Sequence, residues 1–210
     1  MTELQEEETK TLEIIYDQQL VDDIVYKGLA KQEASGDLAL YKEYHEKRDA
    51  IYEMEEESRP RKFRELDSDF FNRLGCNVYI KEIFDEYPDI EEKIESVHIR
   101  RATTKQNEGS NVVDEGRKVI IRLYPEIFVE GSNEICRVIR HELMHVSDMM
   151  DKRFNYNVNE EFSKSPMEER IMRDRYRLFW DISVDGRLTN NGLETPASRE
   201  ERKREFDSFF

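Results

Sequence analysis

Two histidines and a glutamate in the segment HELMH, residues 141–145, have the types and spacing that bind and activate a metal ion. A helix turns about 100° per residue, so His141 and His145 lie one above the other on the same face. At that spacing both imidazole rings can reach one ion at about 2.0–2.1 Å. The pattern therefore predicts a divalent metal site, with Zn2+ as the expected ion.

Glu142 follows the first histidine and is offset round the helix from the ligand row. A metal ion lowers the pKa of a water bound to it toward about 7. Glu142 is placed to accept the proton from that water, which predicts a general base for hydrolysis. The alternative is that both histidines are ordinary helix residues whose ring nitrogens bond to neighbouring groups.

A catalytic zinc site needs a third protein ligand and keeps one position for water. The other two histidines, His45 and His98, precede the motif, so a downstream carboxylate is the better candidate. Asp181 and Asp185 are four residues apart among apolar neighbours, where an unpaired carboxylate is costly. One of them could bind the metal while the other accepts a hydrogen bond from a ligating imidazole. The alternative is an ordinary acidic surface.

Asp148 is a competing candidate on the motif helix itself. It lies on the same face as His141 and His145, but one turn further along. Three ligands in one stripe of an unbroken helix converge poorly on a tetrahedral centre. Asp148 is therefore predicted to support the site, as a hydrogen-bond partner of a ligand or as a loop anchor.

Residues 96–188 resemble the zincin metallopeptidases, in which an HExxH helix follows a sheet whose edge strand lies along the substrate. In the gluzincin branch a later helix carries E-x-x-x-D, with the Glu on zinc and the Asp supporting a ligand His. The segment DISVD, residues 181–185, is similar, with Asp in place of Glu. The resemblance implies that Asp181 is the third ligand and Asp185 the supporting residue. Because Asp is one methylene shorter, the second helix must approach more closely. The metzincin pattern is absent, since Asp148 stands where its Gly would be.

The elements that must position these residues follow from the hydrophobic pattern. Apolar periodicity predicts a helix over 133–150, and a proline after Ser165 predicts the start of another that carries Asp181. Ser198 and Glu201 are predicted to cap a last short helix. Residues 96–104 and 117–124 have the composition of strands and could pair as antiparallel neighbours, joined by a polar loop. The second run stops at Pro125, as an edge strand does, although a fully paired central strand is the alternative.

The N-terminal part is predicted to be helical. Residues 10–57 are expected to form two helices separated at Ser35-Gly36-Asp37, and a further helix is expected to end at Gly75. The expected fold is α+β, mostly helical, with a small zincin-like β-sheet packed beside the HELMH helix. The expected division is an acidic helical extension, residues 1–58, and a metal-binding domain, residues 59–210.

The composition limits the partners. A net charge of −15 argues against nucleic acid and against an anionic membrane surface as ligands. Cys76 and Cys136 are far apart and form no metal-binding pair. The acidic N-terminus has no signal-peptide pattern and no apolar run reaches membrane-spanning length, so a cytoplasmic location is expected.

The predicted function is zinc-dependent hydrolysis of a peptide or protein substrate. His141, His145 and Asp181 would bind the metal, and Glu142 would act as base and then as proton donor. Tyr156, Tyr176 and Arg187 are the candidates for stabilising the oxyanion. The alternative is a non-catalytic interaction protein with a retained metal site, whose acidic N-terminal helices dock partner helices. A third possibility is that those helices cover the cleft and keep the enzyme latent.

Overall fold

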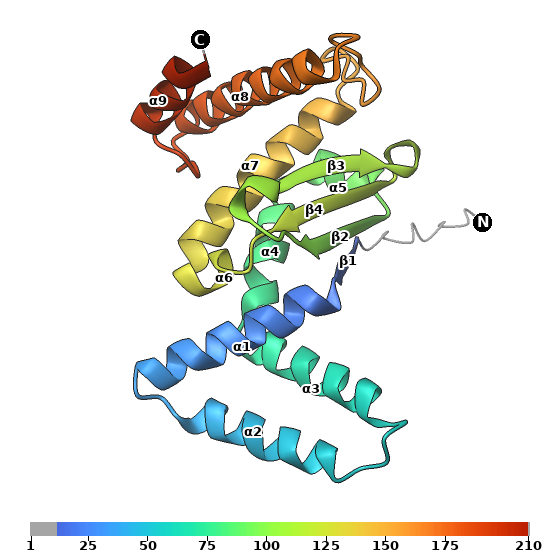
Figure 1. Ribbon diagram of the computed structural model, residues 1–210, viewed down its shortest axis with the longest axis vertical. Helices are drawn as coiled ribbons and strands as arrows, with labels where there is room; N and C mark the ends of the chain where they lie inside the picture. Colours follow the sequence, from blue (N-terminus) through green and yellow to red (C-terminus); the bar gives the residue numbers. More distant parts are fainter. Residues whose placement is uncertain (1–11, 210) are drawn as a thin grey trace, which may run out of the picture.

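A four-stranded sheet lies in the middle of the molecule (Figure 1). The computed structural model describes residues 12–209, so the N-terminus that was examined for a signal peptide lies outside the described residues. The strand order is β1-β2-β4-β3, with β1 parallel to β2, β2 parallel to β4, and β3 antiparallel to β4. The strands are β1 (Glu13–Tyr16), β2 (Ser96–Arg101), β3 (Gly109–Val113) and β4 (Lys118–Leu123).

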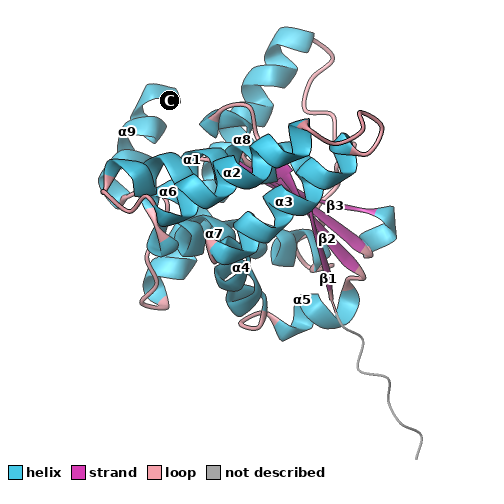
Figure 2. Ribbon diagram, turned by 90° about the horizontal axis from the view of Figure 1, so that it is seen from below, coloured by secondary structure: helices cyan, strands magenta, loops and turns pink. Residues whose placement is uncertain are grey.

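Helices make up most of the rest of the chain, as Figure 2 shows. One group lies at the end of the molecule that is lowest in Figure 1, one flanks the sheet, and one lies at the opposite end. The mostly helical α+β fold with a small sheet is therefore confirmed. The helices are α1 (Gln18–Ala34), α2 (Ala39–Tyr52), α3 (Arg59–Arg73), α4 (Cys76–Phe84), α5 (Pro88–Lys93), α6 (Ile127–Glu130), α7 (Ser132–Met150), α8 (Pro166–Asn190) and α9 (Arg199–Phe209).

The core joins α7 to the sheet. Alternate residues of β4 (Val119, Ile121 and Leu123) are buried in the same hydrophobic cluster as Ile139 and Leu143 of α7. Full burial of each such side chain contributes about 1.5–3 kcal/mol. This packing fixes α7 against the sheet and leaves its histidine-bearing face directed toward α8.

Two predictions about the strands were wrong. Strands β2 and β4 pair in parallel, and residues 13–16 form strand β1 although a helix was predicted there. Over four residues such as EIIY, helical and strand periodicity cannot be separated. Asp17 then caps α1 by accepting a hydrogen bond from the Gln19 amide at 2.8 Å. The chain therefore changes from strand to helix within two residues.

The prediction that β4 is an edge strand is also wrong. Strand β4 is paired on both sides, to β2 and to β3, and β3 takes the edge position. Strand β3 lies inside the segment that was predicted to be a loop. Its sequence GSNVV is short, as edge strands often are, and within residues 12–209 one side of it has no partner strand. The turn into β4 uses left-handed backbone at Asp114, Glu115 and Gly116.

The N-terminal helices share the hydrophobic cluster that contains α7, through residues such as Leu20, Ile24 and Phe70. The division at residues 58 and 59 stays a prediction, and it does not coincide with a break in the core.

The capping box at Ser198 and Glu201 is present, with the Glu201 amide 3.2 Å from Ser198 Oγ and the Ser198 amide 2.7 Å from Glu201 Oε2. Within residues 12–209, no helix has the length and apolar character needed to cross a membrane. Cys76 and Cys136 are free thiols.

Candidate metal centre

Helix α7 carries both histidines on one buried face. It begins after Gly131, whose φ of 134° disfavours a side chain, and Glu134 in its first turn suits the helix dipole. His141 and His145 are each 6% exposed. Their Nε2 atoms lie 3.0 Å apart. The two ring nitrogens therefore point at the same small volume.

Asp181 reaches that volume from α8. Pro166 occupies the first turn of this helix, and the amides of Phe162 and Ser163 before it donate to Glu169. Asp181 Oδ1 lies 3.0 Å from His145 Nε2 and 3.5 Å from His141 Nε2. The Asp181 carboxylate therefore lies within reach of both imidazole rings despite its shorter side chain.

The three atoms form a triangle that fits a tetrahedral ion. Its sides are 3.0, 3.0 and 3.5 Å, between His141 Nε2, His145 Nε2 and Asp181 Oδ1. Ligands held at about 2.0–2.1 Å in tetrahedral geometry are separated by about 3.3 Å. These residues form the one group of three or more His, Cys, Asp and Glu residues with metal-binding spacing within the described chain. The residues present therefore fit zinc, and a fourth position is left for water.

Glu142 is buried beside this triangle, at 5% exposure. Its Oε2 atom is buried and has no hydrogen-bond partner among the described residues. A buried carboxylate oxygen without a partner is costly, so such atoms usually await a water or a ligand. This unpaired oxygen is what a general base beside a metal site requires.

Asp185 is the residue that holds the first histidine. Its Oδ1 lies 2.8 Å from His141 Nδ1, so the ring can donate there while Nε2 faces the triangle. The predicted contact between this carboxylate and a histidine ring is present. In metal sites such a carboxylate fixes the tautomer and orientation of the ligating ring.

The centre favours positive charge. Burial disfavours protonation of His141, but hydrogen bonds to Asp181 and Asp185 outweigh it and raise the pKa of His141 to about 9. Burial favours the neutral acid at Asp181, yet hydrogen bonds from His141 and His145 hold its pKa well below the usual range. A cation that binds here would therefore displace the His141 proton.

Among the described residues the hydrogen-bond partners of Asp148 are on α8, and neither histidine is one of them, although a bond to a ligand was one of its two predicted roles. Its oxygens accept from Trp180 Nε1 at 2.6 Å and from Arg187 at 2.7 and 2.5 Å. Trp180 packs edge-on against the His145 ring, with centroids 4.5 Å apart. Asp148 therefore supports the centre only through Trp180. Arg187 is occupied by this pairing and does not line the cleft, which argues against it as an oxyanion group.

Asp148→Ala is expected to lower the free energy of unfolding by about 1–3 kcal/mol, because it removes a buried carboxylate and leaves partly buried donors on Trp180 and Arg187 without their acceptor. Zinc stoichiometry should stay at the wild-type value. Denaturant unfolding and metal analysis would measure the two effects. Asp151→Ala, which removes a partly exposed carboxylate that pairs with Arg153 at the end of the same helix, is the control. Loss of zinc as complete as in His145→Ala would make Asp148 a ligand after all.

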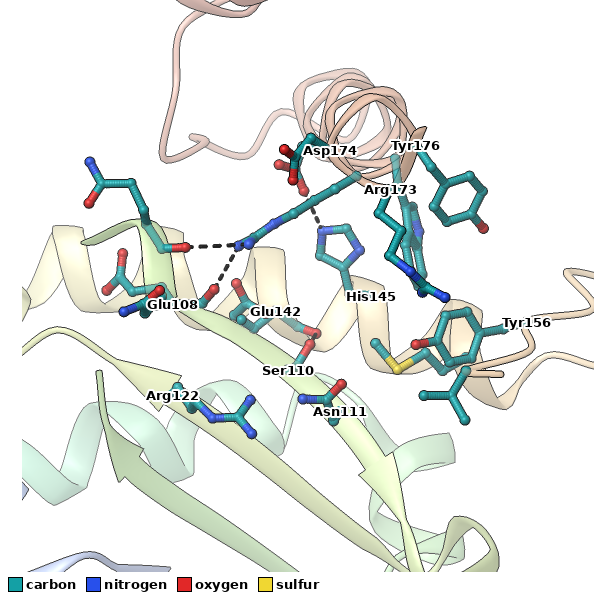
Figure 3. A pocket seen from close by; sticks show the side chains of 18 of the residues that line it. Glu108, Ser110, Asn111, Arg122, Glu142, His145, Tyr156, Arg173, Asp174 and Tyr176 are labelled. Atoms are coloured by element: carbon teal, nitrogen blue, oxygen red, sulfur yellow. Dashed lines mark hydrogen bonds and ion pairs between the residues drawn. The ribbon is translucent and has the colours of Figure 1, made fainter. Parts of the chain in front are cut away.

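A cleft of about 870 Å³ opens beside the centre (Figure 3). Glu142 and His145 face it from α7, and Ser110 and Asn111 face it from the edge strand β3. Ser110 Oγ donates to the Glu142 carbonyl at 3.1 Å, which ties the strand to the motif helix. The cleft wall also contains Tyr156, Tyr176, Trp180 and Asp181. The edge strand, the metal centre and two oxyanion candidates therefore share one cavity.

Two arginines at this site were missed by sequence reasoning. Arg177 of α8 lines the cleft and donates to the carbonyl of Glu108 at 2.6 Å, which links α8 to the start of β3. Arg202 of α9 pairs with Asp185. Both lie in helices rich in charged residues, where no spacing distinguishes an arginine that pairs within the site from a solvated one.

Comparison of the chain with family models, curated proteins and solved structures finds no match.

Proposed function

We propose that this protein is a zinc-dependent hydrolase of peptide bonds. The observation that carries the proposal is the His141–His145–Asp181 triangle beside the unpaired Glu142 oxygen. Two imidazoles and one carboxylate, with a general base next to them, are the donor set of a hydrolytic zinc site. The same donor set underlies the resemblance to the zincins, which is part of the proposal.

The roles follow from the geometry of the side chains. A bound zinc ion would polarise a water molecule and lower its pKa toward about 7. Glu142 accepts the proton at its free carboxylate oxygen and returns it to the leaving amine nitrogen. Asp185 keeps the His141 ring turned so that Nε2 faces the metal position. Tyr156 and Tyr176 remain the candidates for hydrogen bonding to the oxyanion.

Strand β3 takes the substrate-binding role that was first assigned to β4. One side of β3 has no partner strand among the described residues, and its first three residues line the cleft. An extended peptide can add to such an edge through main-chain hydrogen bonds. Ser110 faces Glu142 across this border, so a peptide on β3 lies beside the proposed base. An extended polypeptide is therefore the substrate that the cleft favours.

Incubation of the zinc-loaded chain with a mixture of unstructured peptides would test the proposal. Mass spectrometry should detect internal cleavage that stops on chelation and returns when zinc is restored. If the protein binds zinc stoichiometrically and cleaves none of the peptides, the non-catalytic alternative is favoured. If it binds no zinc at micromolar concentration, both the metal centre and the hydrolytic function are wrong.

A further inference from the structure

The C-terminal helix α9 packs against α8 (Figure 1). One of its arginines, Arg202, lies beside the aspartates of the candidate metal centre. The Arg202 side chain is only 15% exposed, although it lies in a highly charged helix. Its Nε donates to Asp185 Oδ2 at 2.6 Å, and its Nη1 lies 3.8 Å from Asp181 Oδ2. Nη1 also pairs with Glu205 at 2.9 Å, one turn along α9. The guanidinium therefore touches one carboxylate that holds a histidine and approaches the one that would bind zinc.

Asp185 divides its two oxygens between His141 and Arg202. Oδ1 lies 2.8 Å from His141 Nδ1, and Oδ2 lies 2.6 Å from Arg202 Nε. A carboxylate held at both oxygens cannot rotate away from the ring it orients. Arg202 thus extends the contact from the His141 ring on α7, through Asp185 on α8, to a third helix, α9.

The Arg202 guanidinium also offsets negative charge at the site. The carboxylates of Glu142, Asp181 and Asp185 lie close together in a largely buried site. The Arg202 guanidinium, which also pairs with Glu205, offsets part of this negative charge while no cation is bound. Uncompensated like charges in a buried site are costly, so Arg202 keeps Asp185 in place beside the His141 ring.

We propose that Arg202 is a positioning residue of the zinc centre, and that α9 is therefore part of the metal-binding unit. The proposal rests on the proposed function, because it assumes that His141, His145 and Asp181 bind zinc. Arg202 itself touches neither metal nor substrate in this account. It acts through Asp185, which predicts that its effect on zinc disappears when Asp185 can no longer respond to it.

Zinc affinity, measured by competition with a chromogenic chelator, would test this in the full-length chain. Arg202→Ala should bind zinc about 10- to 100-fold more weakly than wild type, as loss of an outer hydrogen-bond partner does. Arg202→Lys should recover part of the loss, because it restores the charge without the guanidinium geometry. Lys203→Ala removes a positive charge from an exposed position on the same helix and should leave affinity unchanged.

A double-mutant cycle with Asp185→Asn separates positioning from general stability. In the Asp185→Asn background, Arg202→Ala should change zinc affinity less than about threefold, because the two residues act as one unit. If Arg202→Ala fails to fold, Arg202→Gln replaces it in the same cycle.

Three results would overturn the inference. If Arg202→Ala binds zinc with wild-type affinity, Arg202 does not position the zinc ligands. An equal loss in both backgrounds would show that Arg202 acts only through helix packing. A wild-type chain that binds no zinc would instead remove the proposed function, and the inference with it.

Discussion

Glu142→Gln should leave zinc bound and slow peptide hydrolysis by at least about 10²- to 10⁴-fold, the usual contribution of a general base. Glutamine fills nearly the same volume, but its amide cannot accept the proton that the carboxylate takes. The buried Glu142 oxygen has no partner among the described residues, so the substitution breaks no side-chain hydrogen bond at that atom. Turnover number and zinc content, measured on the same preparation, would show whether the variant loses activity while zinc stays bound.

Glu130→Gln makes the same chemical change at an exposed position and should keep full activity. The assigned mechanism would be wrong if Glu142→Gln retained wild-type turnover in the zinc-loaded protein. A fall in turnover that only matched a fall in zinc content would assign Glu142 a structural role in metal binding.

His141→Ala, His145→Ala and Asp181→Ala should each lose zinc and activity together, because each removes one of three protein ligands. Their donor atoms form the 3.0, 3.0 and 3.5 Å triangle, and no other group of described residues has metal-binding spacing. Asp185→Ala should cost less, about 10- to 100-fold in zinc affinity, because Asp185 contacts the His141 ring and Arg202 rather than the metal position. Equilibrium dialysis with elemental analysis would rank the four variants.

His98→Ala is the matched control for the histidine variants, since His98 lies on β2 and outside the metal-binding group. It should bind zinc as the wild type does. The ligand assignment would fail if Asp181→Ala kept wild-type affinity or if His98→Ala lost the metal.

The residues of the metal centre could be predicted because their arrangement is local to single helices. The four-residue step from His141 to His145 fixes a shared face, and the same step relates Asp181 to Asp185. An apolar setting around the two aspartates indicated that they were paired rather than solvated. Helix geometry and burial therefore selected the two histidines and the two aspartates, and the resemblance to the gluzincins assigned Asp181 as the third ligand.

The strand arrangement depends on distant contacts and could not be predicted. Strand β3 has a polar, glycine-containing sequence, and it is a strand only because β4 pairs with it. The parallel pairing of β1, β2 and β4 joins segments about 80 and 20 residues apart, which no local pattern specifies. As a result the edge position was assigned to the most strand-like run, β4, when in the structure the more polar β3 occupies it.

Arg202 and Asp148 illustrate the same limit for side chains. Arg202 lies among many charged residues of α9, and only the packing of α9 on α8 makes it a partner of Asp185. Asp148 lies on the same face of α7 as the two histidines, yet Trp180 and Arg187 from α8 donate to its oxygens. Which of several acidic residues meets the metal is therefore decided by the partners that a second helix supplies.

Anomalous diffraction at the zinc edge, from crystals of the zinc-loaded chain, tests the central claim most directly. The account predicts one zinc ion about 2.0–2.2 Å from His141 Nε2, His145 Nε2 and Asp181 Oδ1, with a fourth position open to water beside Glu142. An ion held instead by Asp148 or His98, with Asp181 turned away, would contradict the account, as would crystals with no zinc signal at these residues.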